Sequence, residues 1–436
     1  MGIPYLPLEL NGLARLGARS LDPYLEHLYG AVQMLESGTT TVQMMYTPGR
    51  GVAPIDEEST SKVIKAYQDA GMRLCYAANL QDQNSLVAGP RGGEEEFARL
   101  LPENLGQQFS QFMGRGYWSV DELVGAAEDL FKKFHNSNGG RTIVNTAPTN
   151  VQRCSDELLM GLKELTVRYE TTTHIHLLET VYQKLFGVRI YGTSAVKHLD
   201  DIGFLGPDVV CGHCVWVTED DVGILQRTGA SVCHNANSNL RVFSGIAPVP
   251  HLIQNGIRVG LGTDNMGLND DKDMFQEMRL VLKIHRLPGV DFNPITPYQV
   301  LEMATKNGAL NTGFGGAIGT LEAGKRADMI LVDVNRLEEP FLCPEASIVD
   351  ALVHRIKEVD VDTVLVDGEI VVKDNQSTKV DKRALFKEIK SALDYPLTPE
   401  QLEHRALVQL IYPYLKTFYS ESVGNLTPSF SQYNAR

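Results

Sequence analysis

The sequence predicts an α/β fold in which a TIM-type (β/α)8 barrel is combined with a small β-sandwich domain. Apolar, β-branched segments alternate with amphipathic helical segments along most of the chain. Three successive apolar segments, 171–176, 209–213 and 258–264, each end in a histidine or an aspartate. Ligand-type residues at the carboxyl ends of successive strands are typical of a barrel active site.

The predicted barrel is one strand short of the eight that close such a fold. Its strands begin at about residues 39, 72, 142, 172, 209, 230 and 258. Helices are expected between them, for example over residues 21–38 and 120–134. The first 20 residues, with two early prolines, are expected to be irregular. The polar insertion 81–116 is expected to be a loop with a short helix over the barrel mouth.

The chain divides into three expected parts. Residues 1–318 form the barrel, residues 319–375 form strands of the small β-domain, and residues 376–436 form a C-terminal helical extension. In the second part, Asp367 and Gly368 separate two β-branched runs and predict a tight hairpin.

Composition limits the possible partners. The 436 residues include 40 basic and 54 acidic side chains, and the net charge of −14 argues against nucleic acid or an anionic membrane as a partner. The sequence has no signal-peptide pattern and no apolar run of membrane-spanning length. Six cysteines in so long a chain do not indicate a disulfide framework, so we expect a cytoplasmic protein. We also expect the protein to form a homo-oligomer.

The segment Cys211-Gly-His-Cys214 has the spacing of a redox-active disulfide motif. Such a motif needs its first cysteine at a helix N-terminus, which lowers the thiol pKa. Here the motif lies in an apolar strand, in which cysteines three residues apart face opposite ways. We therefore expect no disulfide between them and no redox function.

The segment around His176 carries the first sign of chemistry. His174 and His176 point to the same face of a strand, and Glu179 follows where the strand gives way to a loop. Imidazole is a good ligand for a divalent metal, and a nearby carboxylate can move protons to and from a bound water. A core histidine beside a surface glutamate would be the simpler interpretation if this segment stood alone. His213 and Asp264, which end later strands in the same way, favour the catalytic interpretation.

Five motifs follow one another along the chain. They are His176-Leu-Leu-Glu179-Thr, Gly212-His213-Cys, His234-Asn-Ala-Asn-Ser-Asn239, Gly262-Thr-Asp264-Asn, and Gly319-Thr-Leu-Glu-Ala-Gly-Lys-Arg-Ala-Asp328. In this combination the sequence resembles the amidohydrolase superfamily, in the branch that holds cytosine deaminase, S-adenosylhomocysteine deaminase and triazine hydrolases. The resemblance covers roughly residues 21–372.

The resemblance implies roles for individual residues. His176 resembles the metal ligand on barrel strand five, and Asp264 resembles the ligand on strand eight, which also takes a proton from the attacking water. His213 resembles the strand-six histidine that orients water or substrate, and Glu179 resembles the proton shuttle. The implied cofactor is one divalent metal ion, zinc or iron, because residues 142–149 lack the lysine that bridges two metals in other members.

These roles imply a metal-dependent hydrolase, in the first place an aminohydrolase that attacks a C=N carbon of a small heterocyclic substrate and releases ammonia. A second interpretation is dechlorination or dealkylamination of a triazine. Glu179 favours ammonia loss, because an amine leaving group needs a proton more than chloride does. A third interpretation is a catalytically impaired chain that acts by binding or association alone.

The start of the chain departs from the family pattern. The family's metal is also held by a His-x-His on barrel strand one, and no histidine precedes residue 21. The absent strand, the absent His-x-His and the half-built β-domain lead us to expect one further N-terminal segment, and weak metal binding without it.

Polar residues after the last two barrel strands are candidates for substrate contact. They are His234, Asn235, Asn239 and Asn265. For residues 234–239 a turn-forming role explains the sequence equally well, and residues 265–273 could instead begin a capped helix. His285, on a predicted helix, is expected to be solvated.

Overall fold

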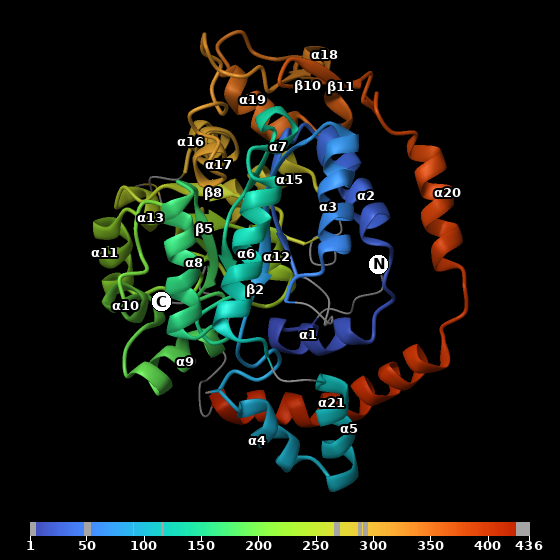
Figure 1. The fold of residues 1–436 in the computed structure, drawn as a ribbon. Coiled ribbons are helices and arrows are strands. Elements are labelled where there is room, and N and C mark those ends of the chain that lie inside the picture. The colour runs from blue at the N-terminus through green and yellow to red at the C-terminus, as the bar shows by residue number, and fades with distance from the viewer. Residues whose placement is uncertain are drawn as a thin grey trace.

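The computed structural model describes residues 6–47, 54–89, 91–114, 117–265, 271–286, 290 and 295–423. In its main part, parallel strands are surrounded by helices, as the alternating sequence pattern predicts (Figure 1). None of the helices in these ranges is long and apolar enough to cross a membrane.

The parallel strands form two groups that continue each other. The first has the order β1-β2-β3, with β4 also paired to β2, and the second has the order β5-β6-β7-β8. Parallel bridges from Thr146 to Thr173 and from Asn150 to His176 join the groups. The strands are β1 (Thr41–Tyr46), β2 (Arg73–Leu80), β3 (Thr142–Val144), β4 (Ala147–Pro148), β5 (Thr173–Leu177), β6 (Val209–His213), β7 (Ser231–His234) and β8 (Val259–Leu261). Within the described residues, β1 pairs with β2 alone and β8 with β7 alone, so the seven predicted strand positions are present, with β3 and β4 as halves of one.

Helices cover the outer side of these strands, and their N-caps explain where several of them begin. Side chains of Asp22, Ser119, Ser155, Thr218 and Thr296 accept hydrogen bonds from backbone N–H groups of the first helical turn, which would otherwise lack partners. The helices are α2 (Pro23–Glu36), α3 (Glu57–Ala70), α6 (Val120–Phe134), α7 (Ser137–Gly140), α8 (Asp156–Arg168), α9 (Val181–Tyr191), α10 (Ala195–Asp201), α11 (Glu219–Thr228), α12 (Ala236–Arg241), α13 (Val249–Gln254), α15 (Met274–Ile284), α16 (Pro297–Ala304) and α17 (Lys306–Asn311). Except for α7 and α17, their buried faces join the strands in the main hydrophobic core.

A four-stranded antiparallel sheet, with the order β12-β11-β10-β9, follows in the sequence. Its strands are β9 (Met329–Val332), β10 (Val361–Val366), β11 (Glu369–Lys373) and β12 (Gln376–Ser377), and α18 (Val334–Glu338), α19 (Ile348–Arg355) and the 3-10 helix Glu358–Asp360 lie between β9 and β10. The predicted hairpin is confirmed, because Asp367 and Gly368 join β10 to β11 with φ values of 55° and 80°, as a type I′ turn requires. A β-sandwich built on this sheet stays a prediction.

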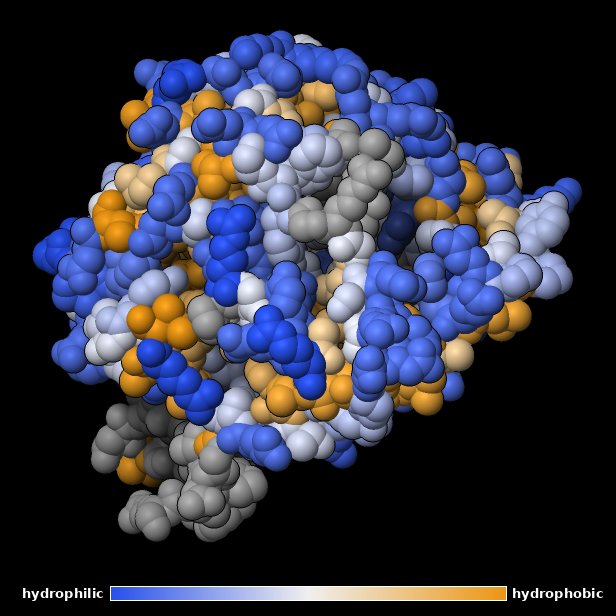
Figure 2. All heavy atoms as spheres, turned by 60° about the horizontal axis from the view of Figure 1, so that its bottom comes forward, coloured by the Kyte–Doolittle hydropathy of each residue, from blue (hydrophilic) through white to orange (hydrophobic). Residues whose placement is uncertain are grey.

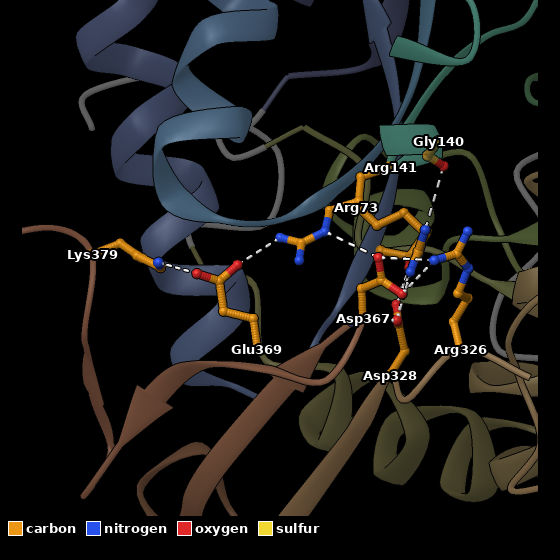
Figure 3. A network of polar contacts seen from close by, with 9 residues as sticks. Arg73, Gly140, Arg141, Arg326, Asp328, Asp367, Glu369 and Lys379 are labelled. Atoms are coloured by element: carbon orange, nitrogen blue, oxygen red, sulfur yellow. Dashed lines mark hydrogen bonds and ion pairs between the residues drawn. The ribbon is translucent and has the colours of Figure 1, made fainter. Parts of the chain in front are cut away.

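A network of ion pairs fixes this sheet to the parallel strands (Figure 3). At its centre, Arg73 of β2 donates hydrogen bonds of 2.9 and 2.7 Å to the two carboxylate oxygens of Asp328. Both side chains are 2% exposed. Asp328 also accepts a hydrogen bond of 2.8 Å from the backbone N–H of Asp367, the first residue of the hairpin turn. The motif residue Asp328 is therefore structural, and it joins the turn to the start of β2.

Four helices from three distant parts of the chain pack together on one end of the strands. They are α1 (Leu8–Leu16), α4 (Gly93–Leu100), α5 (Glu103–Met113) and α21 (Pro399–Val423), which we call the cap, and α20 (Lys382–Leu393) leads into α21. The cap has its own hydrophobic cluster, which includes Leu10, Leu13, Phe97, Phe109, Ile411 and Leu415. Figure 1 shows α21, α4 and α5 beneath the barrel, and the face brought forward in Figure 2 is mostly polar with scattered apolar patches.

The expectation that the first 20 residues are irregular is wrong, because α1 forms there. Pro7 does not prevent this helix, since it occupies the N-cap position, where its missing N–H costs no helical hydrogen bond. The insertion 81–116 holds two helices, not one, and both contribute to the cap.

All six cysteines are free, as expected for Cys211 and Cys214, but the two thiols interact with each other, so the expectation that they face opposite ways is wrong. Cys214 lies just beyond β6 with a φ of 49°, and its Sγ is 3.8 Å from the carbonyl oxygen of Cys211. The neighbouring Cys211 thiol, together with burial, raises the pKa of the Cys214 thiol well above its usual value. Neither thiol lies at a helix N-terminus.

Candidate active site

The strand ends and the cap line one large cavity of about 1920 Å³. His176, Glu179, His213 and Asp264 line it from the carboxyl ends of β5, β6 and β8. Glu9 and Arg15 of α1 and Tyr419 of α21 line it from the cap. The four residues that the sequence selected for catalysis are therefore gathered at one site, although they are spread along the chain from 176 to 264.

His176, in β5, is held by its Nδ1 atom. This nitrogen lies 2.7 Å from the carbonyl oxygen of Thr149, and a carbonyl can only accept, so Nδ1 carries the proton. The other ring nitrogen, Nε2, then presents a lone pair, as a metal-ligating histidine does. Burial, reinforced by the neighbouring His213, lowers the pKa of His176 and keeps the ring neutral.

His174 does not share this role, although it is on the same face of β5. Its Nε2 atom lies 2.9 Å from the carbonyl oxygen of Asn311 and is occupied by that contact. Burial lowers its pKa to about 4, so the ring is a neutral hydrogen-bonding group of the interior.

His213, the last residue of β6, is oriented by Asn239. Its Nδ1 atom donates to Oδ1 of Asn239 over 2.7 Å, and its ring lies over that of His176 with the centroids 5.6 Å apart. Its Nε2 atom faces Oε2 of Glu179 at 3.7 Å. His213 also has a φ of 71°, a strained value for a non-glycine residue that is common at functional sites.

Glu179 is buried at the end of β5, and its backbone N–H donates to Oε1 of Gln183 over 2.8 Å. Burial raises its pKa to about 7, while His176, Arg153 and Arg15 act in the opposite direction. A carboxyl group with a pKa near neutrality can both give and take a proton under physiological conditions.

Asp264 follows β8, and its pKa is shifted in the direction opposite to that of Glu179. Its Oδ2 accepts a hydrogen bond of 2.6 Å from Ser238, and its Oδ1 accepts one of 2.6 Å from the backbone N–H of Asn265. Burial acts to raise its pKa, but His213, the Ser238 hydrogen bond, His176 and Lys272 together hold it below the usual value. The site thus combines an ionised carboxylate with a carboxyl group that titrates near neutrality, which is the division of labour of an acid–base site.

The donors match a divalent metal in type but do not complete a site. His176 Nε2 and the Asp264 carboxylate are suitable ligands, and His213 Nε2 is a further imidazole donor. In the described part of the chain, however, no three His, Cys, Asp or Glu side chains are placed to hold one ion together. His176 and Asp264 thus fit as part of a metal site that needs more donors.

The four candidate substrate residues separate into two pairs. Asn235 and Asn265 line the cavity, whereas His234 and Asn239 are buried behind it. Asn239 supports His213, and residues 236–241 form α12 in place of a polar loop. His234 Nε2 lies 3.3 Å from Nε2 of His285, which is 6% exposed, so the expectation that His285 is solvated is wrong. Its position at the end of α15, turned toward β7, buries it.

Sequence patterns did not indicate the polar residues that reach the site from the cap. Glu9 of α1 accepts a hydrogen bond of 2.5 Å from Thr180, the residue after Glu179. Arg15 of α1 lines the cavity and lies within electrostatic reach of Asp264 and Glu179. Only packing in three dimensions brings residues 9 and 15 to the cavity that residues 179 and 264 line, so no local motif could reveal them.

Comparison with known proteins agrees with this arrangement. The model of the amidohydrolase family matches residues 27–371. The chain belongs to the amidohydrolase family. The expected resemblance and the expected class of hydrolase acting on carbon–nitrogen bonds are confirmed, and the match contains His176, Glu179, His213 and Asp264 but not α1.

Relatives of this amidohydrolase include deaminases of adenine compounds. A 5'-deoxyadenosine deaminase of Methanosarcina mazei is 32% identical over 373 residues, which are 86% of this chain and 76% of the relative. A 5-methylthioadenosine/S-adenosylhomocysteine deaminase of Syntrophomonas wolfei is 30% identical over 366 residues, 84% of this chain and 74% of the relative. The crystal structure of an adenosine deaminase from Xanthomonas campestris with bound zinc superposes with a TM-score of 0.71, covering 87% of this chain and 77% of that one. At 23% identity, this last similarity shows the barrel fold alone.

Proposed function

We propose that this amidohydrolase is an aminohydrolase of adenine nucleosides, which replaces the 6-amino group by oxygen and releases ammonia. The family match and the deaminase relatives support this class of reaction. The observation that carries it is the buried Glu179 carboxyl group, 3.7 Å from His213 and with a pKa of about 7. Loss of ammonia needs a group that protonates first a ring nitrogen and then the leaving amine, and Glu179 is suited to both steps.

The other residues have complementary tasks. Asp264, which stays ionised, accepts a proton from the attacking water at its carboxylate. His213, fixed through Nδ1 by Asn239, orients the reacting groups with Nε2. A divalent ion, for which we propose zinc, would be held by His176 and Asp264 together with further donors and would supply an activated water. We further propose that Asn235 and Asn265, which line the cavity, contact the substrate.

The proposal is tested by a substrate panel with the purified, zinc-supplemented protein. Adenosine, 5'-deoxyadenosine, 5-methylthioadenosine and S-adenosylhomocysteine should release one ammonia per molecule and lose the adenine ultraviolet band. Cytosine, a pterin and a chlorotriazine, which represent the other substrate classes, should be poorer substrates. Chloride release from the triazine without ammonia release from any adenine compound would replace this proposal by the chlorohydrolase interpretation. Light scattering of the same sample tests the proposed homo-oligomer.

A further inference from the structure

The side chain of Asn150 holds a buried oxygen that faces no hydrogen-bond donor. Asn150 lies just beyond β4, lines the cavity, and is only 5% exposed. Its Oδ1 atom accepts no hydrogen bond from any residue that the structure describes. A buried amide oxygen without a donor is costly, because it has given up its hydrogen bonds to water. An unpaired group of this kind in the wall of a cavity indicates that a bound molecule completes the contact.

The strands on either side fix the position of Asn150. On the β5 side, the carbonyl oxygen of Thr149 accepts hydrogen bonds from the backbone N–H of His176, over 3.1 Å, and from Nδ1 of the same residue. On the β2 side, the backbone N–H of Thr149 donates to the carbonyl of Leu80 over 2.9 Å. The carbonyl of Asn150 itself accepts from the backbone N–H of Arg153. The carboxamide therefore projects from a rigid segment, which lowers the entropic cost of ordering it around a ligand.

Asn150 shares its face of the sheet with His176. A parallel bridge pairs the two residues, and both line the cavity. Residues that pair directly across neighbouring strands point to the same face of a sheet. The carboxamide is thus the neighbour of the imidazole that we propose as a metal ligand, and so of the place where the activated water would attack.

The proposed proton shuttle lies on the other side of His176. The next strand, β6, pairs Gly212 with His176 and ends at His213, and Oε2 of Glu179 faces Nε2 of His213 at 3.7 Å. Asn150 comes from the β4 side. A carbon atom held in front of His176 therefore has Glu179 toward β6 and the carboxamide toward β4.

The two edges of a 6-aminopurine match this arrangement. The reacting carbon, C6, lies between N1 and C5, and N7 is attached to C5. If N1 is directed to Glu179, which would protonate it, the 6-amino group and N7 are directed to the opposite, β4 side. A carboxamide is complementary to this edge of adenine, because its oxygen accepts from the amino group while its nitrogen donates to N7.

We infer that Asn150 is a specificity-determining residue, which recognises the 6-amino and N7 edge of the adenine ring with Oδ1 as the acceptor and Nδ2 as the donor. This inference rests on the proposed function, because it takes C6 as the reacting carbon. It gives a reason for selectivity among amino heterocycles, since cytosine has no counterpart of N7. The deaminated product has no amino group to donate to Oδ1, so the same contact favours substrate over product.

The test compares adenosine with 7-deazaadenosine, in which a C–H group replaces N7, on the intact, zinc-supplemented protein. The measured quantity is the ratio of kcat/KM for adenosine to that for 7-deazaadenosine. The intrinsic reactivities of the two compounds are the same for every variant, so a change in the ratio reports on the protein contact. Asn150→Leu, which is similar in shape, should lower the ratio by about tenfold through a loss for adenosine alone.

Two further variants complete the comparison. Asn150→Asp keeps the shape and the acceptor but removes the amide donor, so it should lower the ratio as well. Asn79→Leu is the matched control, because Asn79 is a carboxamide of β2 that lines the same cavity and donates through Nδ2 to Thr47 over 3.2 Å. This variant should keep the wild-type ratio. Thermal unfolding of each variant verifies that it has folded.

The outcomes separate the two proposals. An unchanged ratio in a folded Asn150 variant, or an equal fall of the ratio in Asn79→Leu, overturns the role of Asn150 and leaves the proposed function intact. If the wild type releases ammonia from neither compound, the proposed function fails, and isothermal titration with the same two compounds then decides. The inference stands in that case only if Asn150→Leu weakens adenosine and not 7-deazaadenosine, and it falls if adenosine does not bind.

Discussion

Glu179 and His213 face each other across the end of the parallel strands, with 3.7 Å between Oε2 and Nε2 and only 3% of each side chain exposed. Asn239 holds Nδ1 of His213 as the donor, so Nε2 offers a lone pair to this contact. Burial raises the pKa of Glu179 to about 7, so this carboxyl group can carry a proton at the contact near neutral pH.

Glu179→Gln should lower kcat by about a hundredfold or more, because it removes a positioned acid–base group while it keeps the shape of the side chain. The zinc content should not change, since Glu179 is not among the expected ligands. Glu164→Gln, on the exposed face of α8, is the matched control. Near-normal turnover of the Glu179 variant would remove it from the mechanism.

The sequence predicted the strands well because their signal is local. Apolar runs that end in polar residues marked the β5, β6 and β8 segments, and the parallel arrangement brings their ends together. Asp367 and Gly368 likewise define their turn through their own backbone preferences.

The cap was not predictable in this way, because it exists only through contacts between distant segments. Leu10 and Leu13 of α1 pack in one apolar cluster with residues of α21, which lies almost 400 residues later in the chain. For the same reason, no sequence pattern indicated that Arg15 reaches the cavity. The helix that ends at His285 is visible in the sequence, but the contact of His285 with His234 is not.

The buried pair of Arg73 and Asp328 should be important for stability. Asp328→Asn leaves the guanidinium group buried without its counter-charge, which costs about 3–5 kcal/mol of unfolding free energy. Replacing both residues, as in Arg73→Met with Asp328→Leu, should cost less than the sum of the single changes. The exposed pair of Lys197 and Asp201 is the control, and Lys197→Met should cost less than about 1 kcal/mol. Chemical denaturation measures the wild type, Asp328→Asn, Arg73→Met, Asp328→Leu, their double variant and Lys197→Met, and additive losses would show that the pair is not coupled.

Glu277 of α15 should make stability depend on pH. It is 1% exposed, Oε1 accepts a hydrogen bond of 3.1 Å from the backbone of Asn237, and Oε2 has no hydrogen-bond partner among the described residues. Burial raises its pKa from 4.5 to about 7, so between these values the native state binds more protons than the unfolded state. Stability therefore falls as pH rises through this window.

Glu277→Gln should remove this loss. The variant should match the wild type at acidic pH, where Glu277 is protonated in both states, and should be more stable by on the order of 1–3 kcal/mol above neutral pH. Denaturation midpoints measured across the pH range give the comparison, with Glu164→Gln as the exposed control. A constant difference at all pH values would mean that packing, and not titration, governs this position.

Zinc binding tests the metal site without any assay of activity. His176 and Asp264 offer two donors, His213 adds a possible third, and no three such side chains of the described residues are placed to hold one ion together. Tight zinc sites use three or four protein ligands, so the chain should hold zinc weakly and lose it on dialysis against a chelator.

His176→Ala should weaken equilibrium binding further, by about tenfold or more, since even supporting residues of metal sites have effects of this size. His251→Ala is the matched control, because that side chain is 41% exposed and its ring has hydrogen-bond partners in Glu219 and Asn255, outside the candidate site. Zinc binding that is unchanged by His176→Ala would place the ion elsewhere, and binding that resists the chelator would require donors beyond His176, Asp264 and His213.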